Sequence, residues 1–151
     1  MTSPSDINQP IIETLYCEAL VLADEVRAAF DLSPARAGSE DLVRIALSVE
    51  GLRTTTRMMH VLAWLLNHRA YFGGELSELQ LRRHGVLPPD RPSDPDQLCL
   101  LEPETCTLIA ETEAFHGRIA RLDAAWRDRF AVQPTAVHRL RERLGREFGA
   151  G

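Results

Sequence analysis

Residues 39–74 read SEDLVRIALSVEGLRTTTRMMHVLAWLLNHRAYFGG. Apolar residues recur in this stretch at alternating spacings of three and four, which places them on one face of an α-helix. Ser39 is a favourable N-cap, and Gly73 and Gly74 end the pattern. The stretch therefore predicts a helix over about 39–72 whose apolar seam is formed by Leu42, Ile45, Val49, Leu52, Thr56, Met59, Ala63, Leu66 and Ala70.

Three further runs with helical spacing surround this stretch. The first begins near Pro10 and predicts a helix over about 10–31, and the second begins at Pro103 and predicts one over about 103–130. A shorter pattern predicts a C-terminal helix over about 135–148. Residues 87–96 hold four prolines in ten positions, so we expect a flexible loop over about 85–102, preceded by a short helix or a frayed helix end at 76–83.

Length and composition are those of one globular domain. The 151 residues are 44% hydrophobic and 26% charged, and no apolar run approaches the roughly 20 residues that span a bilayer. The first residues carry no basic segment followed by an apolar one, so we expect no secretory signal and a cytoplasmic protein. The fold expected over 1–151 is all-α: an antiparallel bundle of three long helices, with a Pro-rich loop between the second and third and a short C-terminal helix.

All 17 basic residues are arginines, and the sequence has no lysine. Codon choice in a GC-rich genome explains the total, while the planar guanidinium also suits buried pairing with carboxylates. Residues 10–31 carry five acids and one Arg, whereas residues 39–70 carry three acids and four Arg, so these two helices should attract each other. We expect Glu50 to pair with Arg53 within the helix, and Glu13, Glu18, Asp24 or Glu25 of the first helix to pair with Arg53 or Arg57. Carboxylates of the first helix can also hold Arg69.

The 39–72 helix carries a second apolar stripe around its midpoint. This stripe lies beside Trp64 and the main seam, and it consists of Met58, Val61, Leu62 and Leu65. A helix that is apolar over more than about a third of its circumference lies in a large core or uses the extra face for a partner. We therefore expect a homodimer with these four residues at its interface. The alternative is that residues 76–81 or the C-terminal helix cover the stripe within one chain.

No recognisable catalytic or cofactor site is present in the sequence. No Ser, Cys or Thr lies in a setting that would activate it as a nucleophile, no phosphate loop or dinucleotide fingerprint occurs, and the His and Cys spacings do not fit a metal site. We therefore expect no enzyme, no catalytic residue, no metal and no cofactor. The C-terminal helix carries four arginines that form a solvated face or dock an acidic partner, two interpretations that we prefer to nucleic-acid binding: Arg139, Arg141, Arg143 and Arg146.

A longer motif runs along the 39–72 helix. Residues 50–59 read EGLRTTTRMM, and the motif continues through AWLL at 63–66 to the arginine and alanine at 69 and 70. Over this stretch the sequence resembles the alphaproteobacterial family of the regulator of CtrA degradation, whose long second helix carries Arg-x-Thr-Thr-Arg-x-Met followed by Trp-Leu-Leu and Arg-Ala. The residues at those positions are Arg53, Thr55, Thr56, Arg57, Met59, Trp64, Leu65, Leu66, Arg69 and Ala70.

The resemblance implies a helical-bundle dimer without catalysis that acts as an adaptor for the ClpXP protease. The type member of the family helps to deliver the response regulator CtrA and other substrates to that protease in cell-cycle control. We therefore expect partners of three kinds: a second copy of the chain, the protease complex, and its protein substrates. Two other functions stay open on the residues alone: a DNA-associated regulator that uses the four C-terminal arginines, and a small-molecule sensor with an apolar pocket between its helices.

Overall fold

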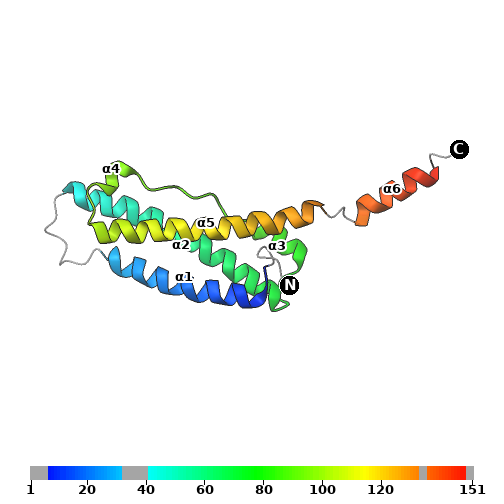
Figure 1. The fold of residues 1–151 in the computed structure, drawn as a ribbon, viewed down its shortest axis with the longest axis horizontal. Coiled ribbons are helices and arrows are strands. Elements are labelled where there is room, and N and C mark those ends of the chain that lie inside the picture. The colour runs from blue at the N-terminus through cyan, green and yellow to red at the C-terminus, as the bar shows by residue number, and fades with distance from the viewer. Residues whose placement is uncertain (1–6, 32–40, 133–135, 149–151) are drawn as a thin grey trace.

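The structure, a computed structural model, describes residues 7–31, 41–132 and 136–148. The described residues form helices and irregular segments without a strand, so the all-α prediction is confirmed. No helix among them is long and apolar enough to cross a membrane. Figure 1 shows the described helices in chain order: α1 (Gln9–Ala29), α2 (Asp41–Phe72), α3 (Glu78–His84), α4 (Pro95–Leu98), α5 (Pro103–Val132) and α6 (Ala136–Phe148).

Local sequence signals explain where these helices begin and end. The side chain of Asn8 accepts a hydrogen bond at 3.0 Å from a backbone N–H of the first turn of α1, where Pro10 has no N–H to satisfy. Ser77 and Gln80 form a reciprocal capping box at the start of α3. Gly74 adopts a positive φ of 79° just after α2, which is the expected helix stop. Ser39, the predicted N-cap of α2, lies outside the described residues.

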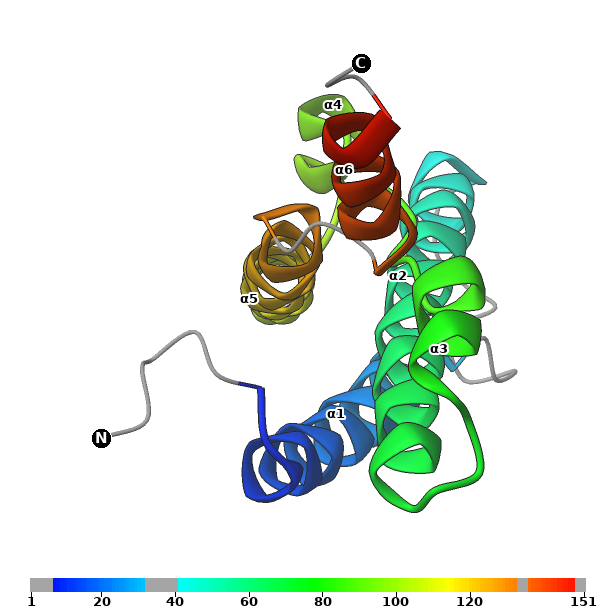
Figure 2. The same ribbon diagram turned by 90° about the vertical axis from the view of Figure 1, so that its right-hand side faces the viewer.

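Three long helices, α1, α2 and α5, pack against one another and enclose the main core. Figure 2 shows them arranged around a common interior, with α3 beside α2. Burying a large aliphatic or aromatic side chain contributes about 1.5–3 kcal/mol, so this cluster supplies most of the apolar driving force for the fold. Its buried members are Ile12, Leu15, Ala19, Val26, Met58, Val61, Trp64, Leu65, Leu87, Phe115 and Ile119.

The structure corrects the prediction of which face of α2 is buried. Residues of the predicted seam lie on the surface of the described chain, and Leu52 is 70% exposed. The stripe predicted as a dimer interface instead packs into the core: Met58, Val61 and Leu65 are at most 2% exposed, and Leu62 is half-buried beside them. The surface position expected for Met58, Val61 and Leu65 is therefore wrong, because these three residues are inside a single chain, whereas Leu62 keeps part of its surface exposed.

Polar residues of α2 explain why the face predicted to be buried is the exposed one. Glu50, Arg57 and His68 all lie on the buried face, so apolar spacing alone makes that face look interrupted. Each of the three forms a hydrogen bond within the chain, which offsets part of the cost of burying it, although Oε2 of Glu50 and Nε2 of His68 have no partner among the described residues. The buried face also carries Trp64 and therefore removes more apolar area from water than a run of smaller residues would.

The proline-rich segment, residues 85–94, packs against the long helices. Residues 85–94 contain no helix, as their prolines predict, and the single turn of α4 comes next. Leu87 belongs to the core cluster, and its N–H donates to the carboxylate of Asp123 at 3.4 Å. A ring nitrogen of His116 lies 3.1 Å from the carbonyl oxygen of Pro88. The segment predicted as a flexible loop is therefore attached to α5 at several points.

Candidate protein-interaction site

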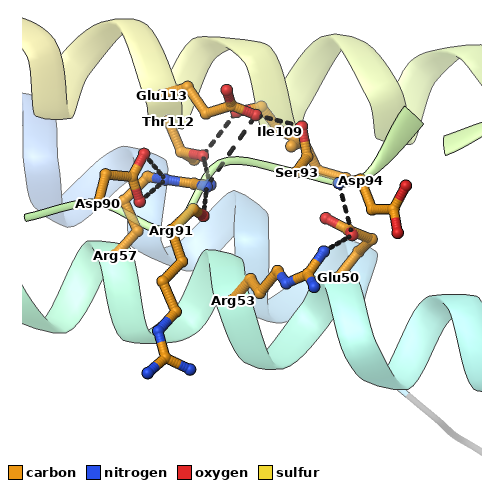
Figure 3. Close-up of polar contacts among 10 residues, drawn as sticks. All are labelled: Glu50, Arg53, Arg57, Asp90, Arg91, Ser93, Asp94, Ile109, Thr112 and Glu113. Carbon is orange, nitrogen blue, oxygen red and sulfur yellow. Dashed lines mark hydrogen bonds and ion pairs between the residues drawn. The ribbon is translucent and has the colours of Figure 1, made fainter. Parts of the chain in front are cut away.

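Arg57 is the centre of a polar network between α2, α5 and the proline-rich segment (Figure 3). Its buried guanidinium donates from Nε to both carboxylate oxygens of Asp90 at 2.8 Å. Nη1 donates to the hydroxyl oxygen of Thr112 at 2.9 Å, and Nη2 donates to the backbone carbonyl of Arg91 at 3.0 Å. Each guanidinium nitrogen thus holds a different partner, an arrangement that the single ammonium of a lysine cannot reproduce.

Two further carboxylates extend this network along the segment. Glu113 lies 4.0 Å from Nη2 of the buried guanidinium and accepts a hydrogen bond from the Ser93 hydroxyl at 2.6 Å. Glu50 is fully buried, and its Oε1 accepts from Arg53 at 2.7 Å and from the backbone N–H of Asp94 at 3.2 Å. The contacts fix the path of residues 90–94 across α2 and α5, as Figure 3 shows. We call this network the arginine clamp. It consists of Glu50, Arg53, Arg57, Asp90, Arg91, Ser93, Asp94, Thr112 and Glu113.

The pairing predicted for the three arginines of the motif is confirmed for two of them. Arg53 pairs with Glu50 within α2, and Arg69 pairs with Glu13 of α1 at 2.9 Å. The hydrogen bond to Glu13 raises the pKa of Arg69 above its ordinary value. The third prediction is wrong, because Arg57 binds an acid of the proline-rich segment and no acid of α1.

Sequence reasoning missed the partners that the buried groups use. Asp90 lies between prolines, where periodicity says nothing about the path of the chain. Asp123 lies on the apolar face of α5 and accepts a hydrogen bond from the indole nitrogen of Trp64 at 3.0 Å. An acid on the apolar face of a predicted helix is a usable signal, because a buried carboxylate requires donors from a neighbouring element.

His68 is a second buried polar group of α2. Nδ1 lies 3.0 Å from the carbonyl oxygen of Trp64, and since a carbonyl can only accept, this nitrogen carries the proton. The imidazole stacks on the Trp64 ring with centroids 3.8 Å apart and meets the edge of Trp126 at 5.5 Å. Burial in this apolar setting lowers the pKa of His68 below its ordinary value of 6.5. The side chain is therefore neutral at physiological pH.

The clamped segment forms one wall of a surface pocket of about 400 Å³ beside α2. Its other walls come from α2 itself, including three residues of the predicted seam, Val49, Leu52 and Thr56. Of the arginines at its edge, Arg53 is partly exposed and Arg91 is exposed. The pocket therefore combines an apolar wall with an edge that carries three arginines and one aspartate.

A row of exposed apolar side chains continues along α2 from this pocket. Each of its five members is between 47% and 70% exposed in the described chain. A monomer rarely presents a contiguous row of large apolar residues unless the row contacts another molecule. We call this row the α2 stripe, and it consists of Leu42, Ile45, Leu52, Met59 and Leu66.

The positions that carry the resemblance divide between the two faces of α2. Packing within the chain explains the buried ones, which are Arg57, Trp64 and Leu65. Arg53, Arg69 and Ala70 lie between the two faces and are half-buried. The remaining positions are exposed, and two of them belong to the α2 stripe: Thr55, Thr56, Met59 and Leu66.

Residues 4–148 match a family of proteins described as being of unknown function, DUF1465. The chain belongs to the DUF1465 family. No curated protein and no solved structure matches it significantly. The family match spans every described helix, so the arginine clamp, the α2 stripe and α6 all lie within the DUF1465 region.

The C-terminal helix of this DUF1465 protein carries the four arginines predicted to dock a partner. Every described side chain of α6 is exposed, and Figure 1 shows the helix beyond the end of α5. α6 has no extensive contact with any other described helix. The docking role stays a prediction for Arg139, Arg141, Arg143 and Arg146.

Proposed function

We propose that this DUF1465 protein is a non-enzymatic adaptor that binds other proteins and helps to deliver them to the ClpXP protease. The observation that carries the proposal is the α2 stripe, an apolar row that the fold of one chain leaves uncovered among its described residues. Its members lie three or seven residues apart, and a seven-residue repeat is the spacing with which one helix packs against another. A helix of another protein is therefore the ligand that this surface fits best.

The scaffold supports such a role because it holds the surface in place. In the proposed architecture α1, α2 and α5 act as a three-helix bundle, and the arginine clamp fixes the proline-rich segment beside the α2 stripe. A surface that is already ordered loses little conformational entropy when it binds. Rigid presentation of a docking surface is what an adaptor without catalysis requires.

The charge at the pocket indicates the chemistry of the partner. Arg91 is exposed, while its backbone carbonyl anchors the segment through Arg57. It offers positive charge at the edge of the α2 stripe, next to the partly exposed Arg53, whose Nη1 pairs with Glu50. We expect the partner to present an amphipathic helix with an apolar seam and at least one acidic residue facing these arginines.

The resemblance to the regulator of CtrA degradation supplies the biological setting of the proposal. It supports CtrA as a candidate substrate, ClpXP as the protease, and cell-cycle control as the process. The exposed motif positions, Met59 and Leu66 among them, agree with this setting because packing within one chain does not account for them.

A binding measurement tests the proposal. The full-length protein is immobilised, and the retention of ClpX together with its accessory proteins is measured for wild type, for Leu52→Glu combined with Met59→Glu, and for Leu79→Glu. Leu79 is a matched control because it is 59% exposed on α3, outside the α2 stripe. Wild type and control should retain ClpX, and the double variant should bind about tenfold more weakly or less. Equal retention by all three would contradict the role of the stripe, and no retention by wild type would contradict the adaptor function.

A further inference from the structure

A second surface of the molecule has an apolar floor and an acidic rim. It is a groove of about 620 Å³ between α1 and α5. Val21, which is 62% exposed, and Leu22, Ala114 and Phe115 supply the apolar atoms. The charged residues at the groove are three glutamates and one arginine, a net charge of −2: Glu18, Glu25, Glu111 and Arg118.

The helix α6 has the complementary properties. One face carries apolar side chains that are between 44% and 83% exposed: Val137, Leu140, Leu144 and Phe148. The rest of the helix carries four arginines and two glutamates, a net charge of +2 over residues 136–148 without histidine. An amphipathic helix with a basic face suits an apolar groove with an acidic rim, because both the hydrophobic effect and the electrostatic attraction favour the contact.

We infer that α6 of a second copy of this chain occupies the groove between α1 and α5. The lengths agree. Val137 and Leu144 are seven residues apart, which is about 10 Å along a helix, and Glu18 and Glu25 span the same distance along the groove on α1. The apolar face of α6 therefore covers the floor, with its arginines beside the glutamates of the rim.

The length of the connection favours a second copy over the same chain. Phe115 precedes Val132 by 17 residues, or about 26 Å along α5, and Glu142, the middle of α6, follows Ala136 by six residues, or about 9 Å. If α6 folded back over the groove, Ala136 would lie about 17 Å behind Val132 along α5. The four Cα steps from Val132 to Ala136 reach about 14 Å at most, and crossing to a neighbouring helix uses about 8–10 Å of that reach. The connection is therefore too short to place α6 in the groove of its own chain.

A reciprocal exchange follows, in which each copy inserts α6 into the groove of the other. Such an arrangement is closed and two-fold symmetric, as in most homodimers. It differs from the homodimer expected from the sequence, because none of the four residues predicted for that interface takes part. It also leaves the α2 stripe available, so this inference stands or falls independently of the adaptor function.

Sedimentation of full-length variants over a range of concentrations tests the exchange. Leu140→Glu combined with Leu144→Glu damages the inserted helix, Val21→Glu damages the groove, and Leu79→Glu is the matched control. We expect the dissociation constant of the dimer to rise at least about tenfold for both damaged proteins and to stay unchanged for the control. Mixing the two damaged proteins should restore association, because one intact helix then meets one intact groove. A monomeric wild type, or a dimer unaffected by either change, would overturn the inference.

The cysteines provide a second test without any substitution. Cys17 lines the groove, whereas Cys99 is an exposed thiol away from it. Labelling of each cysteine by a maleimide is followed by mass spectrometry at increasing concentrations of the wild-type protein. We expect labelling of Cys17 to slow several-fold as the concentration rises, while labelling of Cys99 stays constant. Protection of Cys17 that does not depend on concentration would indicate insertion within one chain, and no protection would indicate an empty groove; either result overturns the inference.

Discussion

At the scale of single residues, Arg57 is the group on which the arrangement of the proline-rich segment depends. Its guanidinium holds the Asp90 carboxylate, a hydroxyl and a backbone carbonyl, and it is shielded from water. Hydrogen bonds that involve a charged group contribute more than neutral ones, and a buried partner left without them retains its full desolvation cost. The clamp is therefore sensitive to the geometry of this side chain as well as to its charge.

Replacing Arg57 with lysine should lower the free energy of unfolding by about 2–3 kcal/mol, because one ammonium cannot satisfy three partners in different directions. Urea denaturation of the purified full-length variant measures this. Arg91→Lys is the control: the exposed side chain changes, while the backbone carbonyl that Arg57 uses is retained. The control should lie within about 0.5 kcal/mol of wild type. Equal stability of both variants would show that the clamp has no energetic role.

His68 makes the stability of the protein depend on pH in a defined direction. Burial lowers its pKa in the folded state, so as the pH falls below 6.5 the unfolded chain takes up a proton before the folded chain does. Stability is therefore fully present above pH 6.5 and is lost as the pH falls from there toward the lowered folded-state pKa. The urea concentration at the unfolding midpoint should decrease from about pH 7.5 to about pH 5.5, and this decrease should be larger for wild type than for His68→Gln. The same fall in both proteins would contradict the assignment.

The ion pairs of the three motif arginines differ in whether the sequence predicts them. The pairs of Arg53 and Arg69 follow from helical neighbourhood and from the attraction between an acidic and a basic helix. The bond from Arg57 to Asp90 joins residues 33 positions apart through a segment without periodicity. No local rule gives the path of such a segment, so its contacts could not be predicted.

At the scale of elements, α2 shows why apolar spacing does not determine which face is buried. Both faces carry apolar residues, and the more regular one is exposed. The buried face is interrupted by Glu50, Arg57 and His68, each of which has a partner on its own helix or on a neighbouring element. Spacing identifies a helix and its stripes, while the partners of polar groups decide which stripe faces the core.

Two substitutions of the same kind separate the two faces of α2. Leu65→Glu places a charge in the core, where the side chain is fully buried, and should cost several kcal/mol and prevent stable folding. Leu52→Glu changes a side chain that is on the surface, and it should alter stability by about 0.5 kcal/mol at most. Thermal unfolding followed by circular dichroism measures both. A folded Leu65→Glu protein, or an unfolded Leu52→Glu protein, would reverse the assignment of the faces.

At the scale of the whole molecule, sequence patterns predicted the helical class and the four longer helices to within two residues wherever they are described. They did not predict that the proline-rich segment packs on the bundle, because Asp90, Thr112 and Asp123 act only when distant elements meet. The proposed adaptor function rests on the α2 stripe and on the resemblance. It predicts that the molecule acts through surfaces and changes the rate of a reaction that another protein catalyses.

The most direct measurement is the rate at which ClpXP degrades CtrA, with the accessory proteins of the same cell, in the presence and absence of this DUF1465 protein. We predict that wild type and Leu79→Glu accelerate degradation by at least about fivefold, and that Leu52→Glu combined with Met59→Glu does not. The double variant must keep the helical content of wild type for the comparison to count. A degradation rate that is the same with and without the wild-type protein would contradict the adaptor function.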